Sequence, residues 1–207
     1  MKGKFIVIEG IDGSGSSSQA KLIHDYIIEK KGKCILTSEP SDGPVGNLIK
    51  QILHGRLNIH SKQYIREAEL SYLFAADRFD HLYNEQNGVM TLLQQGIDVV
   101  CTRYFPSSYA YHCFDNNFEM VHSLNKNFPP PDVLFYLDVD IEVSIERIKR
   151  SRKADINENI DNLRRVKKNY EKFFENYQFE VERIDANNDP IDIFADLLNI
   201  LETKLNS

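Results

Sequence analysis

Short apolar runs rich in β-branched and aromatic residues alternate along the chain with stretches of helical spacing. Runs of this kind are typical of strands that are buried on both faces of a sheet. Their alternation with helices predicts one α/β domain over residues 1–207, with a parallel sheet covered on both faces. The predicted strands are Phe5–Ile8, Cys34–Leu36, Val99–Cys101, Val133–Val139 and Glu180–Ile184.

Three helices are indicated by apolar positions three and four residues apart. The last one has Asp189 as its expected N-cap and Pro190 in its first turn, and both residue types favour a helix start there. The apolar stripe of the first helix is Leu22, Ile23, Tyr26 and Ile27, and that of the second is Ile141, Ile145 and Ile148, with Val143 off the stripe. The stripe of the third helix is Ile193, Phe194, Leu197, Leu198 and Leu201.

Turn-rich stretches follow the first three predicted strands, at Gly10–Gly15, Glu39–Gly46 and Thr102–Ser108. Parallel strands end at a common edge of the sheet, and open α/β sheets bind their ligands there. We therefore expect a binding site built from these three stretches.

The stretch from Gly10 to Ser17 lies between a predicted strand and a predicted helix and resembles a phosphate-binding P-loop. Gly10, Gly15 and Ser17 match the pattern, and Gly13 adds a further flexible position. The glycines let backbone N–H groups turn toward phosphate oxygens, the helix N-terminus favours an anion, and the Ser17 hydroxyl is suited to Mg²⁺. The predicted ATP phosphate site is Gly10, Asp12, Gly13, Ser14, Gly15, Ser16, Ser17 and Ser18, with Ser17 as the metal-binding residue.

Ser16 stands where the P-loop pattern has a lysine, which normally offsets phosphate charge in the transition state. Three explanations stay open. Another cation acts in its place, the chain binds nucleotide but turns over poorly, or the residue has been replaced by engineering. The candidate catalytic cations are Arg103, Arg147, Arg150 and Arg152.

The net charge of −6 disfavours a polynucleotide-binding protein, whose affinity comes from clustered basic residues. No apolar run approaches the roughly 20 residues of a membrane helix, and the N-terminal run is too short for a signal peptide. Three cysteines without metal-ligand spacing predict no disulfide. We therefore expect a cytoplasmic protein. The segment 147–168 is locally basic, which fits either a solvated helix face or an anion site.

Six motifs extend this picture over nearly the whole chain. They are Phe5–Gly15, Glu39-Pro40 with Gly43–Gly46, Leu73–Arg78, Arg103-Tyr104 with Ser107-Ser108 and Ala110-Tyr111, Pro131-Asp132 with Phe135–Val139, and the acidic pair Asp155 and Glu158. With these motifs in this order the chain resembles the thymidylate kinases, a family that phosphorylates dTMP with ATP. The resemblance implies a P-loop NTPase-type three-layer α/β/α fold with a five-stranded parallel sheet. It also implies a short helical lid at about residues 147–160, Mg²⁺ as cofactor and a homodimer.

The resemblance also assigns roles to individual residues. Phe74 stacks on thymine and Arg78, four residues on along a helix, donates to its carbonyl oxygen; alone, this spacing would favour a core phenylalanine and a surface arginine. Arg103 contacts the acceptor phosphate, which its planar fork suits. The implied dTMP site is Asp12, Glu39, Pro40, Phe74, Arg78, Arg103, Tyr104, Ser107, Ser108 and Tyr111.

The chain departs from the family pattern at three further places. Thr102 replaces an aspartate, Ser38 replaces a frequent arginine, and His112 replaces a frequent glutamine. We expect phosphorylation of dTMP to dTDP, with Arg103 and the lid arginines offsetting charge. A kinase for another deoxynucleotide, a nucleotide sensor with little or no kinase activity, and a structural protein without ligands remain alternatives.

Overall fold

A parallel five-stranded sheet forms the centre of the computed structural model, which describes residues 2–114, 117–151 and 160–205. The strand order is β2-β3-β1-β4-β5. The strands are β1 (Phe5–Gly10), β2 (Cys34–Ser38), β3 (Asp98–Thr102), β4 (Val133–Asp138) and β5 (Glu182–Asp185). The predicted fold class and all five predicted strands are confirmed, although the last strand begins at Glu182 rather than Glu180.

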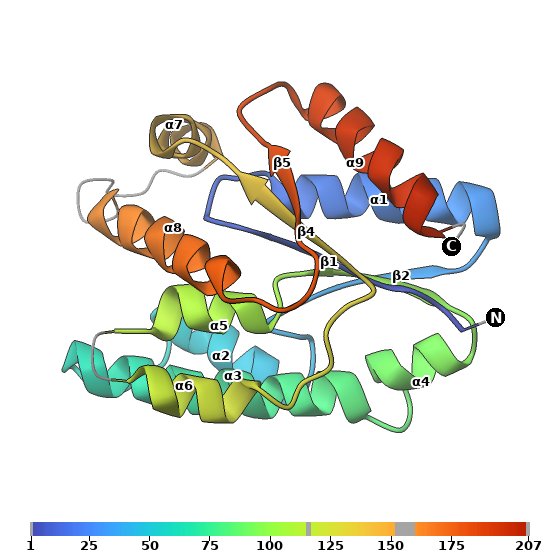
Figure 1. The fold of residues 1–207 in the computed structure, drawn as a ribbon. Helices are drawn as coiled ribbons and strands as arrows, with labels where there is room; N and C mark the ends of the chain where they lie inside the picture. Colours follow the sequence, from blue (N-terminus) through green and yellow to red (C-terminus); the bar gives the residue numbers. More distant parts are fainter. Residues whose placement is uncertain (1, 115–116, 152–159, 206–207) are drawn as a thin grey trace.

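Helices cover both faces of the sheet (Figure 1). The helices α1 and α9 pack together over one face, while α5 and α8 pack together on the other, with α3 and α6 beyond them. The helices are α1 (Ser16–Lys31), α2 (Pro44–Leu53), α3 (Gln63–Tyr83), α4 (Val89–Gln94), α5 (Phe105–His112), α6 (Phe118–Asn125), α7 (Ile141–Ser151), α8 (Ile160–Glu175) and α9 (Pro190–Leu205). The three helices predicted from apolar spacing correspond to α1, α7 and α9.

The core lies where the apolar strands meet these helices. Every residue of β1 and β3 is buried, as expected for inner strands of a doubly covered sheet. From α1 and α9, Ile23, Ile27 and Leu197 are fully buried against the sheet. The predicted stripes therefore match the buried faces only in part. Leu22 of the α1 stripe is 37% exposed, and the predicted stripe of α7 is half-buried rather than buried.

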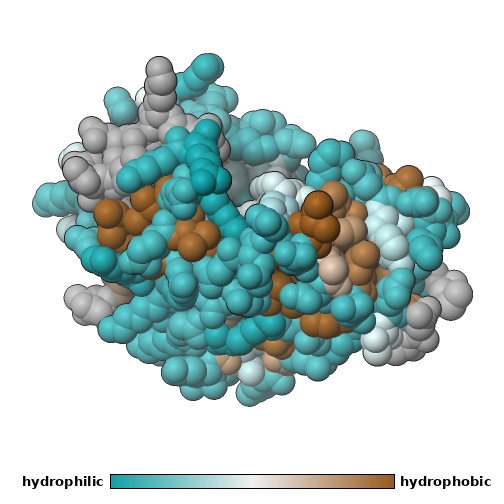
Figure 2. Space-filling model, turned by 90° about the horizontal axis from the view of Figure 1, so that it is seen from above, coloured by the Kyte–Doolittle hydropathy of each residue, from teal (hydrophilic) through white to brown (hydrophobic). Residues whose placement is uncertain are grey.

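Figure 2 shows the molecule from above, relative to the view of Figure 1. This face is mainly hydrophilic, and its hydrophobic residues gather in separate areas. No helix in the described part of the chain combines the length and the apolar composition that a membrane crossing requires.

One predicted turn is shorter than expected. The stretch Thr102–Ser108 was predicted as a turn, but Thr102 is the last residue of β3 and α5 begins at Phe105. Only Arg103 and Tyr104 connect the two elements. A proline in the first turn of α5 fits a helix start, because its missing N–H would have no helical partner there.

Candidate active site

The loop between β1 and α1 has the backbone geometry of an anion cradle. Gly13 and Gly15 have φ values of 79° and 93°, a left-handed region that glycine adopts without steric cost. Gly15 is the N-cap of α1 and provides no side-chain cap, and the first turn of α1 contains no acidic residue. The first N–H groups of α1 are therefore available to an anionic ligand, together with the positive end of the helix dipole.

Hydroxyl groups surround this cradle. Ser17 and Ser18 are exposed at the start of α1, whereas Ser16 is only 8% exposed. The Ser14 hydroxyl is buried and has no hydrogen-bond partner among the described residues, which is unusual for a buried polar atom. An unpaired hydroxyl in this loop fits a site that is completed by a ligand.

Helix α7 holds the phosphate loop in place through hydrogen bonds to its backbone. The Ser144 hydroxyl donates to the carbonyl oxygen of Asp12 at 2.6 Å, and Arg147 donates to the carbonyl oxygens of Ser14 at 3.4 Å and Ala186 at 2.8 Å. A third carbonyl, that of Asn188, accepts from Arg147 at 2.9 Å. The guanidinium of Arg147 is thus bound to backbone carbonyls and holds the loop in place, and its contact with donor phosphates stays a prediction.

The other predicted lid cations lie elsewhere. The Arg150 side chain is 76% exposed and pairs with Glu146 at 2.5 Å, one helical turn earlier. Arg152 lies outside the described residues, as do Asp155 and Glu158 and most of the segment 147–160 that was predicted to form the lid. The described part of that segment consists of the end of α7 and the first residue of α8.

Three of the predicted site residues meet beside the loop. Arg103 donates to the Asp12 carboxylate at 2.5 Å and to the Tyr111 hydroxyl at 2.9 Å, and Tyr111 donates to Asp12 at 3.2 Å. The guanidinium carbon also lies 4.6 Å from the centre of the Tyr111 ring. Residues from the phosphate loop, the end of β3 and α5 therefore form one compact cluster.

The sheet register explains how Arg103 reaches the loop. Ile8 of β1 lies opposite Thr102 of β3, and the Arg103 N–H donates to the Ile8 carbonyl at 3.0 Å. Arg103 has φ of 66°, in the left-handed region that non-glycine residues rarely occupy. Strained backbone of this kind concentrates at functional sites. Burial lowers the pKa of Arg103, but Tyr111 and Asp12 raise it more, so the guanidinium stays charged.

A buried carboxylate lies beneath this cluster. Glu9 is fully buried and accepts from the Ser107 and Tyr170 hydroxyls, both at 2.7 Å, and from the Tyr104 N–H at 2.7 Å. Burial raises the pKa of Glu9, and these hydrogen bonds with the charge of Arg103 counter only part of that rise. Ser107 belongs to this buried network and also accepts from Arg103 at 3.3 Å, and its contact with dTMP stays a prediction.

A second buried network contains Arg78, which is 1% exposed. Its guanidinium pairs with Glu39 at 2.7 Å, donates to the Ser108 hydroxyl at 3.1 Å and donates to Asn125. His81 also contacts Glu39, at 3.3 Å. Arg78 and Glu39 therefore brace each other, and the predicted contacts of Arg78, Glu39 and Ser108 with dTMP would require a ligand that reaches this network.

Phe74 and Pro40 are both half-buried. The Phe74 ring lies 5.1 Å from the ring of His112, which contacts Glu67 at 3.1 Å. Phe74 therefore keeps part of its ring accessible for stacking, as the resemblance implies.

Tyr104, which the resemblance places in the dTMP site, is a core residue. It is 0% exposed, its ring packs edge-on to Phe5, and its hydroxyl donates to the Pro129 carbonyl at 3.0 Å. Its contact with dTMP stays a prediction.

Sequence reasoning missed three residues that organise the site: Glu9, Ser144 and Tyr170. The sequence did contain a signal for Glu9, because a single glutamate directly follows the apolar run Phe5–Ile8. A charged residue on a buried strand needs polar partners. Nothing local marks Ser144 or Tyr170, which reach the site only through the packing of α7 and α8.

Comparisons with known proteins agree with this geometry. Residues 8–197 match the family model described as thymidylate kinase. The chain is 34% identical over 207 residues to a probable thymidylate kinase of Pyrococcus horikoshii, covering 99% of this chain and 98% of the relative. It is 39% identical over 183 residues to a probable thymidylate kinase of Methanocaldococcus jannaschii, covering 86% and 85% of the two chains.

Solved structures show the same fold. A thymidylate kinase from Candida albicans superposes with a TM-score of 0.75 at 25% identity, covering 99% of this chain and 93% of that one. A thymidylate kinase from Ehrlichia chaffeensis gives a TM-score of 0.73 at 22% identity, covering 98% and 99%.

Proposed function

The chain belongs to the thymidylate kinase family, a group of nucleoside-monophosphate kinases, and on that premise we propose that it transfers the γ-phosphoryl group of ATP to dTMP, giving ADP and dTDP. The observation that carries this proposal is the cluster of Asp12, Arg103 and Tyr111 beside the phosphate loop. It brings an acceptor-binding cation next to a donor-binding loop, which phosphoryl transfer requires.

The donor phosphates bind in the loop between β1 and α1. This assignment is supported by the first turn of α1, which has no side-chain cap and offers N–H groups and the positive end of the helix dipole to an anion. ATP binds together with Mg²⁺, and the exposed hydroxyl of Ser17 would be a ligand of this ion. When bound, Mg²⁺ offsets charge on the phosphate oxygens.

The acceptor phosphate binds to Arg103. A planar guanidinium can hold two phosphate oxygens at once, and its contacts with Asp12 and Tyr111 orient it before the nucleotide arrives. Asp12 accepts from the 3′-hydroxyl of the sugar, Tyr111 packs on the deoxyribose, and Phe74 stacks on the base. The acceptor phosphate is already ionised, so the transfer needs positioning and charge stabilisation rather than a strong general base.

The location and assembly of the protein are further parts of the proposal. Its three cysteines are free thiols, which supports a reducing compartment such as the cytoplasm. Tyr72, Phe79 and Tyr83 of α3 are between 42% and 61% exposed and follow one another at helical spacing. Exposed aromatic residues in a row mark interaction surfaces, which supports a homodimer that packs through α3.

A coupled assay of ADP release with Mg-ATP and dTMP tests the proposed function. We expect ADP release that requires dTMP and falls at least a hundredfold in Arg103→Ala, because an unpaired phosphate charge in the transition state is costly. Arg56→Ala is the matched control, since Arg56 is exposed beyond the end of α2.

Two results would contradict the proposal. Binding of dTMP without any ADP release would make the chain a nucleotide-binding relative that no longer catalyses. Faster turnover of dCMP than of dTMP or dUMP would contradict the thymidylate assignment, because the guanidinium of Arg78 can donate to the C4 carbonyl oxygen of thymine and uracil but not to the amino group that cytosine has there.

A further inference from the structure

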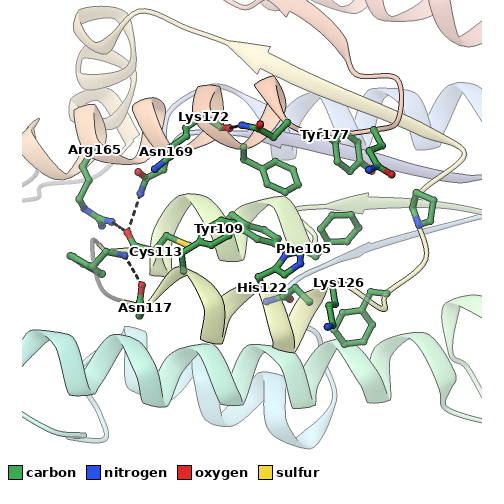
Figure 3. Close-up of a pocket in the computed structure, with 18 of the residues that line it drawn as sticks. Phe105, Tyr109, Cys113, Asn117, His122, Lys126, Arg165, Asn169, Lys172 and Tyr177 are labelled. Carbon is green, nitrogen blue, oxygen red and sulfur yellow. Dashed lines mark hydrogen bonds between the residues drawn. The ribbon is translucent and has the colours of Figure 1, made fainter.

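A cavity of about 930 Å³ is lined by residues of α5, α6 and α8 and of the segment that follows α8. In Figure 3, α8 and the segment after it form one wall, with Arg165, Asn169, Lys172 and Tyr177. Helices α5 and α6 form the opposite wall. No residue of the Asp12, Arg103 and Tyr111 cluster lines this cavity.

The walls of the cavity are rich in aromatic rings. Tyr109 and Phe173 stack with their centres 4.5 Å apart, and Phe118 stacks on His122 at 5.7 Å. The Tyr109 hydroxyl also contacts His122 at 3.1 Å, which fixes both side chains. Preordered ring faces of this kind favour a flat, apolar ligand at little cost in conformational entropy.

The charge of the cavity differs from that of the whole chain. The net charge of the chain is −6, but the described lining residues include Lys126, Arg165 and Lys172 and no aspartate or glutamate. A hollow lined by charges of one sign concentrates ligands of the opposite sign. The charges on the cavity walls therefore favour an anion over a cation.

Two of the three cations are available to a ligand. Arg165 donates to the carbonyl oxygens of Tyr111 and Cys113 and lies over the ring of Phe114, so it serves the structure. The ammonium groups of Lys126 and Lys172 have no hydrogen-bond or ion-pair partner within the described parts of the chain, and the two residues lie on opposite walls (Figure 3). An anionic group between these walls can approach either ammonium.

Tyr177 adds an unpaired donor to the same cavity. Its hydroxyl is buried and has no hydrogen-bond partner among the described residues, although buried hydroxyls are normally paired. Burial raises the pKa of Tyr177 to about 12, so the hydroxyl keeps its proton at neutral pH. It remains a hydrogen-bond donor that no protein group uses.

We propose that this cavity is a second ligand site, separate from the nucleotide site, and that it takes a planar aromatic molecule carrying one anionic group. The ring system packs against Tyr109 and Phe173, and the anion lies toward Lys126 or Lys172. Its volume is within the range of small-molecule sites.

A pair of fluorescent probes tests both halves of this proposal on the full chain. The first probe is 8-anilinonaphthalene-1-sulfonate, an aromatic anion, and the second is N-phenyl-1-naphthylamine, a neutral molecule with the same ring system. We expect saturable binding of the sulfonate at one site per chain, tighter than that of the neutral probe. Saturating ATP and dTMP should leave this binding in place.

Variants then assign the probe to the cavity. The double variant Lys126→Glu/Lys172→Glu should weaken sulfonate binding by roughly tenfold or more, because each exposed charge contributes about a factor of five. The neutral probe should bind as before. Lys126→Gln/Lys172→Gln removes the charges without adding repulsion and should give an intermediate loss.

The matched control is Lys2→Glu/Lys33→Glu, which makes the same change in net charge at two exposed lysines outside the cavity. Equal sulfonate affinity in the two double glutamate variants would overturn the proposal. Equal affinity for the two probes would refute the anionic class, and displacement by dTMP would refute a separate site. An unchanged unfolding temperature in both double variants would show that a loss of binding does not come from a loss of folding.

Discussion

Arg103 joins a left-handed backbone conformation to a charged cluster at the end of β3. The strained conformation places its guanidinium over Tyr111 and against Asp12, where an ordinary extended residue would continue the strand. The surrounding contacts therefore fix this side chain before any substrate binds.

Glu9 gives a prediction at the residue scale about pH. Burial raises the pKa of Glu9 above its ordinary value of 4.5 in the folded state, so the folded protein binds this proton more tightly than the unfolded chain does. As pH rises through and above about 4.5, ionisation of Glu9 therefore costs stability. We therefore expect the free energy of unfolding of Glu9→Gln, relative to that of the natural chain, to become larger as pH increases.

Urea unfolding at pH 5 and pH 8 measures this difference. The advantage of Glu9→Gln should be larger at pH 8, by roughly 1 kcal/mol. Glu119→Gln, at an exposed position on α6, is the control and should show no such trend. An advantage of Glu9→Gln that shrinks with pH would contradict a raised pKa.

Ser16 gives a second prediction at this scale. If the site lacks only the cation of the usual P-loop, Ser16→Lys should raise kcat by roughly tenfold or more, because the new ammonium would offset developing charge on the phosphates. Ser16→Met, similar in length but uncharged, is the control. Unchanged or lower kcat in Ser16→Lys would mean that another cation already acts there.

At the scale of elements, α7 and the phosphate loop fit together closely. A Cβ atom added at Gly13 would lie 2.6 Å from the Ser144 carbonyl oxygen, whereas one added at Gly15 would meet nothing within 4 Å. Both glycines have positive φ, so alanine is strained at either position.

The two alanine variants should therefore differ in stability. Gly15→Ala should cost about 1–2 kcal/mol for the backbone conformation alone. Gly13→Ala should cost about 1–3 kcal/mol more, because α7 must move away from the loop. Chemical unfolding without nucleotide measures both. Equal losses would show that α7 does not confine the loop.

At the scale of the whole molecule, the strand order creates the site. The chain leaves β1 toward β2 on one side and later returns to place β4 on the other side, so the order reverses at β1. Ligands of open α/β sheets bind at such reversals, beyond the carboxyl ends of the strands. The phosphate loop after β1 and Arg103 after β3 lie at this edge.

The exposed aromatic row of α3 gives a prediction about assembly. Phe79, which is 61% exposed, should be buried between two copies, so Phe79→Glu should convert a dimer into a monomer. Light scattering during gel filtration measures the mass. Ile191→Glu changes an equally apolar and more exposed position on α9 and should stay dimeric. A natural chain that elutes as a monomer would refute the proposed dimer.

Local sequence determined the five strands, the helices α1, α7 and α9, the fold class and the phosphate loop. Short apolar runs mark the strands, apolar spacing marks these helices, and Gly13 and Gly15 mark a backbone that glycine adopts readily. These signals lie within a few residues of one another, so they can be read without knowing the fold.

Only the tertiary structure decided which predicted site residues meet. It joins Asp12 with Arg103 and Tyr111, places Tyr104 in the core, and ties Ser107 to the buried Glu9. These outcomes depend on the register of β1 against β3 and on the packing of α5 against α8 on one face of the sheet. Contacts between residues about a hundred positions apart arise from that packing, and local sequence carries no physical signal for them.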